Sequence, residues 1–63
     1  MLVFAVIIGF KDGRVLNLPD CDGVLFHTYE NKRYVVFFAC DVQIGAIEQD
    51  MIQAIKFIPN RTL

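Results

Sequence analysis

The fold is decided by MLVFAVIIGFKDGRVLNL, residues 1–18 of the chain. Residues 1–10 are rich in β-branched and aromatic side chains and lead into a turn signal, which is typical of a β-strand. In the following segment 11–14 (Lys-Asp-Gly-Arg), the Asp-Gly pair supplies the positive φ angles that a two-residue hairpin turn requires. Residues 14–18 are expected to return as the partner strand and to stop at Pro19. This stretch therefore predicts a β-hairpin.

A second hairpin is expected after a polar loop over residues 20–23. Residues 24–29 (Val-Leu-Phe-His-Thr-Tyr) have strand composition, and residues 30–33 (Glu-Asn-Lys-Arg) form the expected turn. Residues 34–40 (Tyr-Val-Val-Phe-Phe-Ala-Cys) then form the returning strand. The two hairpins follow one another along the chain, which predicts a mainly β protein.

The segment after Asp41 is ambiguous. Apolar residues recur there at helical spacing, at Ile44, Ile47, Met51, Ile52 and Ile55. Against a long helix, residues 42–45 look strand-like, and Gly45 weakens a helix by about 1 kcal/mol relative to Ala. We expect a loop or short helix near residues 45–51, a closing strand over residues 51–58 that ends before Pro59, and a tail over residues 60–63. The expected fold is a small open barrel or sheet; the alternative is an α+β fold with one C-terminal helix.

The apolar content predicts self-assembly. The chain has 63 residues, enough for a single domain over residues 1–63, and 56% of them are hydrophobic, with a mean hydropathy of +0.48. A chain of this size buries only about 60% of the surface that its unfolded form exposes. The strands expected at residues 1–10 and 34–40 are apolar on both faces, and one small domain cannot cover all four faces. We therefore expect a homo-oligomer; the alternative is a groove that faces lipid or is filled by a ligand.

Composition also argues against several environments and partners. The apolar run of residues 1–10 is about half of what a membrane-spanning helix needs, and no basic region of a signal peptide precedes it. We expect a cytoplasmic protein without a targeting segment and without membrane association. A net charge of −1 and a pI near 5.6 argue against nucleic-acid binding, because binders of phosphate backbones are generally basic.

No constellation of residues predicts catalysis or a bound cofactor. Cys21 and Cys40 are expected as free thiols, and His27 as the wall residue of a strand. The chain contains no serine, so a serine nucleophile is excluded. The aspartates lie beside expected turns, where their side chains bond the local backbone, at Asp12, Asp20, Asp22 and Asp41. We expect no enzyme activity, no metal and no cofactor.

Cations and tyrosines gather at the two expected hairpin tips. If both tips point the same way and copies assemble, these residues could surround an anion such as a phosphate group. The flanking tyrosines could stack on a base. The alternative is that charged turn residues simply keep the turns hydrated. The candidate ligand-binding residues are Lys11, Arg14, Tyr29, Lys32, Arg33 and Tyr34.

Two resemblances bear on function. Residues 10–16 (Phe-Lys-Asp-Gly-Arg-Val-Leu) resemble the strand–turn–strand of Sm-like proteins, small ring-forming β-barrels, which implies RNA binding; the Arg-Gly pair of that family's second motif has no counterpart here. The layout from this hairpin to residues 52–58 is also similar to small β-rich accessory proteins of bacteriophages and mobile elements. That resemblance implies a protein that acts by binding, including inhibitors of host defence and proteins that sequester nucleotide signals.

These observations leave three hypotheses. The first is a non-enzymatic oligomeric module that sequesters a small anionic, nucleotide-like ligand at a subunit interface. The second is a protein-interaction or inhibitor module that acts on a host protein through an apolar strand or patch. The third is an Sm-like RNA binder.

Overall fold

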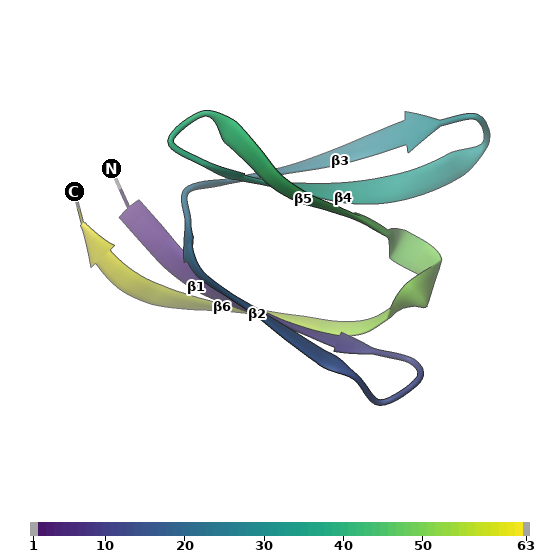
Figure 1. The fold of residues 1–63 in the computed structure, drawn as a ribbon, viewed down its shortest axis with the longest axis horizontal. Coiled ribbons are helices and arrows are strands. Elements are labelled where there is room, and N and C mark those ends of the chain that lie inside the picture. Colours follow the sequence, from purple (N-terminus) through teal and green to yellow (C-terminus); the bar gives the residue numbers. More distant parts are fainter. Residues whose placement is uncertain (1, 63) are drawn as a thin grey trace.

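The computed structural model describes the backbone of residues 2–62 and the side chains of residues 2–60. Six strands and one short 3₁₀ turn follow one another along the chain (Figure 1): β1 (Leu2–Phe10), β2 (Val15–Cys21), β3 (Gly23–Tyr29), β4 (Lys32–Ala39), β5 (Val42–Glu48), η1 (Gln49–Met51) and β6 (Ile52–Thr62). They form two antiparallel three-stranded sheets, ordered β2-β1-β6 and β3-β4-β5. The mainly β prediction with two consecutive hairpins is confirmed, and the described strands do not close into a barrel.

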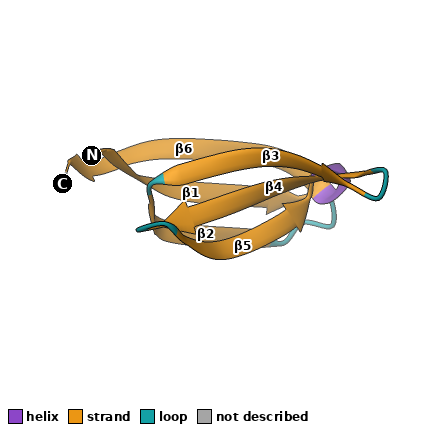
Figure 2. Ribbon diagram, turned by 90° about the horizontal axis from the view of Figure 1, so that it is seen from above, coloured by secondary structure: helices purple, strands orange, loops and turns teal. Residues whose placement is uncertain are grey.

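The two strands predicted to lack a polar face are the central strands of the two sheets. β1 lies between β2 and β6, and β4 lies between β3 and β5. Figure 2 shows the sheets stacked, with β3 and β6 on one side of the sandwich and β2 and β5 on the other. The fully buried core comes mainly from β1 and β4 and consists of Val6, Ile8, Cys21, Val35 and Phe37. A central strand has a neighbouring strand on each side and the other sheet against one face, which explains the apolar residues on that face.

The expected end of β2 was wrong. β2 continues through Pro19 to Cys21, and only Asp22 separates it from β3. Pro19 is tolerated because β2 is an edge strand and the β1–β2 pairing has a bulge between Phe4 and Val6. Cys21, expected in a polar loop, is 1% exposed and its Sγ donates to the Gly23 carbonyl (3.3 Å).

The C-terminal third also differs from the prediction. The expected loop or short helix near residues 45–51 is present only as the three-residue 3₁₀ turn η1, because β5 continues to Glu48. The alternative α+β fold with a C-terminal helix was wrong. β6 does not stop before Pro59 and extends to Thr62, where a tail was expected. Pairing with β1 and a bond from Asn60 Nδ2 to the Pro19 carbonyl (3.0 Å) hold this last part in place.

The turns use different geometries from those expected. The β1–β2 connection is a longer loop in which Gly13 alone has a positive φ, of 93°. The Gly13 N–H donates to the Phe10 carbonyl (3.0 Å) and the Phe10 N–H to the Arg14 carbonyl (2.9 Å), as in a type I turn followed by a glycine bulge.

Two-residue turns with positive φ at both positions occur instead in the second sheet. They lie at Glu30-Asn31 (51° and 65°) and at Cys40-Asp41 (52° and 62°). Lys32 and Arg33, expected in a turn, therefore belong to β4. Cys40, expected at the end of that strand, lies in a turn and is exposed.

Candidate functional site

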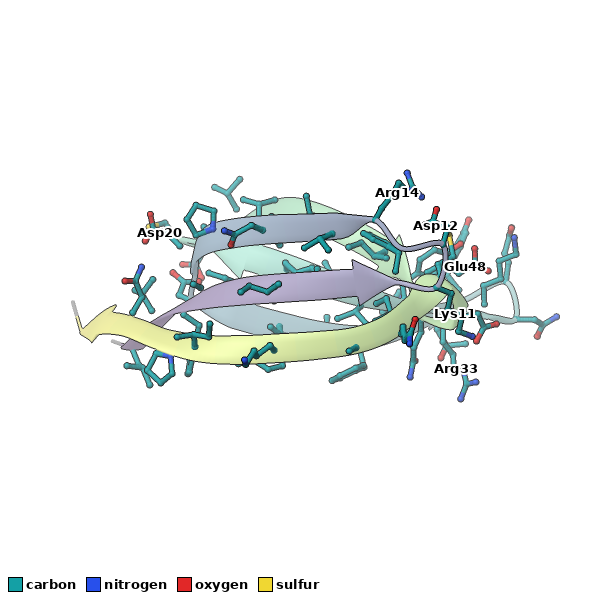
Figure 3. The ribbon with its side chains drawn as sticks, turned by 90° about the horizontal axis from the view of Figure 1, so that it is seen from below. Lys11, Asp12, Arg14, Asp20, Arg33 and Glu48 are labelled. Atoms are coloured by element: carbon teal, nitrogen blue, oxygen red, sulfur yellow. The ribbon has the colours of Figure 1, made fainter. Side chains whose placement is uncertain are left out.

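Both hairpin tips lie at the same end of the molecule. Figure 1 shows the β1–β2 loop and the β3–β4 turn on either side of η1, and Figure 3 places Lys11, Arg14 and Arg33 at this end, opposite Asp20. The Lys11 N–H donates to the Met51 carbonyl (3.0 Å), which joins the first tip to η1. The common direction on which the predicted cation cluster depends is therefore present.

Carboxylates share this end with the cations. Arg14 Nε donates to Asp12 Oδ2 (2.6 Å), and the Arg14 guanidinium also lies 5.3 Å from the centre of the Phe10 ring. Arg33 lies 4.0 Å from the Asp50 carboxylate in η1. Both ion pairs are largely exposed, so each contributes little to stability. The end of the molecule is thus a surface of mixed charge, on which two of the candidate cations already face a carboxylate.

The Asp12 carboxylate is held in its charged form. The Arg14 backbone N–H donates to Oδ1 (3.0 Å), and this bond, more than the bond and charge of the Arg14 side chain, lowers the pKa of Asp12. Asp12 therefore organises the turn at this tip, as expected for an aspartate beside a glycine turn.

Strand register separates the remaining candidates by face. Tyr29 pairs with Lys32 across the β3–β4 hairpin, and Tyr34 lies two residues beyond Lys32, so these three share one face of the sheet. Arg33, at the intervening position, is on the opposite face. The Tyr29 side chain is 59% exposed, and Lys32 takes part in no ion pair with any described residue. Tyr29, Lys32 and Tyr34 thus form a small aromatic and cationic group.

This group continues into an apolar surface. Because Val35 and Phe37 point into the core, the alternate residues of β4 point outward. We call this outward face, over all three strands, the outer strip. Its cross-strand rows are Tyr29–Lys32, His27–Tyr34–Glu48 and Leu25–Val36–Ala46. Leu25 is 52% exposed, whereas Val36, in the middle, is only 8% exposed.

The sequence did not indicate two acidic neighbours of the candidate residues. Glu48 faces Tyr34 across β4 and β5, and Asp50 approaches Arg33 from η1. Both belong to the segment whose structure was ambiguous, and no local pattern in it shows where a return strand will bring its side chains.

Other types of site are not found. Within residues 2–60, no three metal-ligating side chains come together and no pocket is formed. Both cysteines are free thiols, Cys21 buried and Cys40 exposed. No helix in the described part of the chain is long and apolar enough to span a membrane.

No family model, curated protein or solved structure matches this chain. The resemblances to Sm-like proteins and to phage accessory proteins therefore remain predictions.

Proposed function

We propose that this protein is a non-enzymatic, homo-oligomeric binding module that captures a small anionic ligand with a flat ring, such as a nucleotide, at a subunit interface. The observation that carries the proposal is the shared face of Tyr29, Lys32 and Tyr34 at the turn end of the β3–β4 hairpin. Sequestration of a nucleotide signal is a role such a module would have in a bacteriophage accessory protein.

The chemistry of the three side chains is complementary to a nucleotide. The Lys32 ammonium group is a point charge with three donors, suited to a phosphate group. An aromatic ring supports a stacked base by about 1–3 kcal/mol, and Tyr29 offers an exposed ring while Tyr34 is half-buried. The group therefore combines a phosphate contact with a surface for stacking.

A single copy supplies too little positive charge for a phosphate. Lys32 is the one candidate cation on the outer strip, and Glu48 lies on the same face beside Tyr34. Capture of a doubly charged phosphate group is therefore favoured only if a second copy adds a cation or covers the ligand. This is the reason to locate the site at a subunit interface.

A thermal-shift screen of mono- and cyclic nucleotides, with inorganic phosphate alongside, tests the proposal. A ligand present at about 100 times its Kd stabilises the fold by about 2.7 kcal/mol, which for a domain of this size raises Tm by about 10 °C or more. Lys32→Gln should raise the Kd for the active nucleotide by about tenfold, because one charge-assisted bond is lost. Lys56→Gln, which removes the same charge from β6 of the other sheet, should leave it unchanged. No shift with any nucleotide would refute the proposal.

A second candidate, a protein-interaction or inhibitor module acting on a host protein, is favoured by the exposed apolar surface. Large apolar side chains at least 45% exposed occur on several strands and in η1: Leu2, Val15, Leu25, Phe26, Tyr29, Val42, Met51 and Phe57. Pull-down from a bacterial lysate distinguishes this candidate, since a stoichiometric protein partner would support it over the first. RNA binding, the third prediction, requires retention of RNA that weakens as salt is raised.

A further inference from the structure

The four edge strands of the two sheets differ in how they are protected from pairing with another strand. Proteins block an edge with charged side chains, prolines or bulges. β2 carries Pro19 and Asp20, β6 carries Lys56 and Pro59, and both pair with β1 through bulges. β5 ends in Glu48, and its pairing with β4 is also bulged.

β3 has none of these features. Its sequence, GVLFHTY over Gly23–Tyr29, contains no proline, aspartate, glutamate, lysine or arginine, and it pairs with β4 without any shift of register. Three of its side chains are large and exposed: Leu25 (52%), Phe26 (65%) and Tyr29 (59%). Of the four edges, β3 is the one open to a further strand.

We propose that β3 pairs antiparallel with β3 of a second copy, about a two-fold axis at Phe26, and joins the two β3-β4-β5 sheets into one sheet of six strands. Centred on Phe26, this pairing engages all seven residues of the strand. Each copy then has its open edge satisfied by the other, and the assembly closes as a dimer.

A symmetric partner suits this strand better than an unrelated protein strand. In a two-fold pairing the strand lies against the same strand of the other copy, so a charged strand would face like charges. β3 carries no aspartate, glutamate, lysine or arginine, so its pairing with itself brings no such repulsion. The pairing also keeps like faces together, because residues across from each other share a face. On the outer strip, Leu25 meets the second copy's His27. On the face toward the other sheet, Val24 meets Thr28 and the two Phe26 side chains meet at the axis.

On the side of the sandwich where β3 lies, the other sheet also exposes apolar side chains. β6 and β3 lie on one side of the molecule in both Figure 2 and Figure 3. Phe57 of β6 pairs with the core residue Val6 but is 45% exposed, as expected for a core-facing side chain on the outermost strand of a sheet. A standard interface removes about 800 Å² from each partner. That is less than a fifth of the 4501 Å² surface of one copy, and this side of the sandwich supplies apolar side chains from both layers.

This dimer specifies the oligomer of the proposed function but does not depend on its ligand. The pairing places Tyr29 of each copy across from Gly23 of the other, on the same face as Phe38, whose Cβ lies 3.5 Å from the position that a Cβ on Gly23 would take. A ligand on Tyr29, Lys32 and Tyr34 would then lie beside the second copy, and each dimer would have two such sites. The test below uses ligand-free protein, so its result is separate from that of the nucleotide screen.

Sedimentation velocity and native mass spectrometry over a range of concentrations should show a dimer of the full chain. Phe26→Lys should raise the dimer Kd by about 100-fold or more, because it sets two like charges against each other at the axis. Val15→Lys is the matched control, since it adds the same charge to a 68% exposed apolar residue on β2. This variant should dimerise as the wild type does.

A mixing experiment identifies the partner as a second copy. Phe26→Lys and isotope-labelled Phe26→Glu should each be monomeric alone and should form a heterodimer when mixed. Hydrogen exchange of the wild type supplies a measurement without substitutions: the amides of residues 24–28 should become more protected as protein concentration rises. A wild-type monomer at all concentrations, equal loss of the dimer in Val15→Lys, mixed variants that stay apart, or β3 amides protected only by a host protein would each overturn the proposal.

Discussion

The two sheets are built on one plan but differ in their edges. Each has a central strand that is apolar on both faces, β1 in one and β4 in the other, and each contributes to the core between them. Both edges of the β2-β1-β6 sheet contain a proline and a charged residue, whereas β3 in the other sheet has neither. The comparison indicates that one sheet is closed to further pairing while the other keeps one edge open.

The largest expected effect comes from the shared core. Phe37→Ala removes the largest fully buried side chain and should lower the free energy of unfolding by about 3–5 kcal/mol, most of the stability expected for 63 residues. Phe38→Ala, at the next position of β4 but only half-buried, should cost clearly less. Urea unfolding measures both. Equal losses would mean that the two faces of β4 contribute alike and that the core is not between the sheets.

Removing the residues that protect the β6 edge should change the oligomeric state. Lys56→Leu combined with Pro59→Thr removes the proline and one of the two charged residues of β6, which should make this edge more open to pairing. A second open edge beside the proposed one on β3 would allow larger assemblies, and the average mass should exceed that of the wild type at the same concentration by about a factor of two or more. Light scattering after gel filtration measures this mass. An unchanged mass would show that neither residue keeps the β6 edge closed.

Substitutions in the turns are expected to change stability by an intermediate amount. Cys40→Asn with Asp41→Gly places Asn-Gly where both φ angles are positive, and should stabilise the fold by about 1 kcal/mol, or raise Tm by about 4–8 °C. The bond from the Cys40 N–H to Asp22 Oδ2 (2.7 Å) involves the backbone and is retained. Gly13→Ala, at φ 93° in the other sheet, should destabilise by a similar amount. Shifts of the same sign in thermal unfolding would contradict this account.

The smallest effect concerns pH and the β1–β2 loop. The pKa of Asp12 is lower in the folded protein than in the unfolded chain, so its contribution to stability is present above about pH 4. That contribution is lost as pH falls through the folded-state pKa. Asp12→Asn should therefore be slightly less stable than the wild type at pH 7 and equally stable in strong acid. Thermal unfolding at both pH values measures the difference; one that persists in acid would mean that the carboxylate charge is not its cause.

The candidate site could be predicted from the sequence only in part. The sequence identified the tyrosines and cations near the hairpin tips, because those residues flank recognisable turns. It could not indicate that Tyr29 would share a face with Lys32 and not with Arg33, since a shift of register by one residue exchanges the faces of a strand. Nor could it indicate Glu48 beside Tyr34, which depends on how β5 returns along β4.

The sequence predicted which segments form strands better than it predicted where those strands end. Composition alone identified the strands of both hairpins, because β-branched and aromatic residues favour extended backbone. The predicted ends of β2 and β6, at Pro19 and before Pro59, are wrong because both strands continue through the proline. A proline stops a strand only where its missing N–H would be needed, and at an edge or a bulge it is not.

By itself, the sequence determined a mainly β chain with two strands that require burial on both faces, because side-chain chemistry and alternation are local properties. Only the tertiary structure decided which strands lie at the edges, which side chains share a face and that both hairpin tips point to one end. These depend on pairing between segments far apart along the chain, and the free energy of such pairing comes from long-range packing that no short stretch of residues contains.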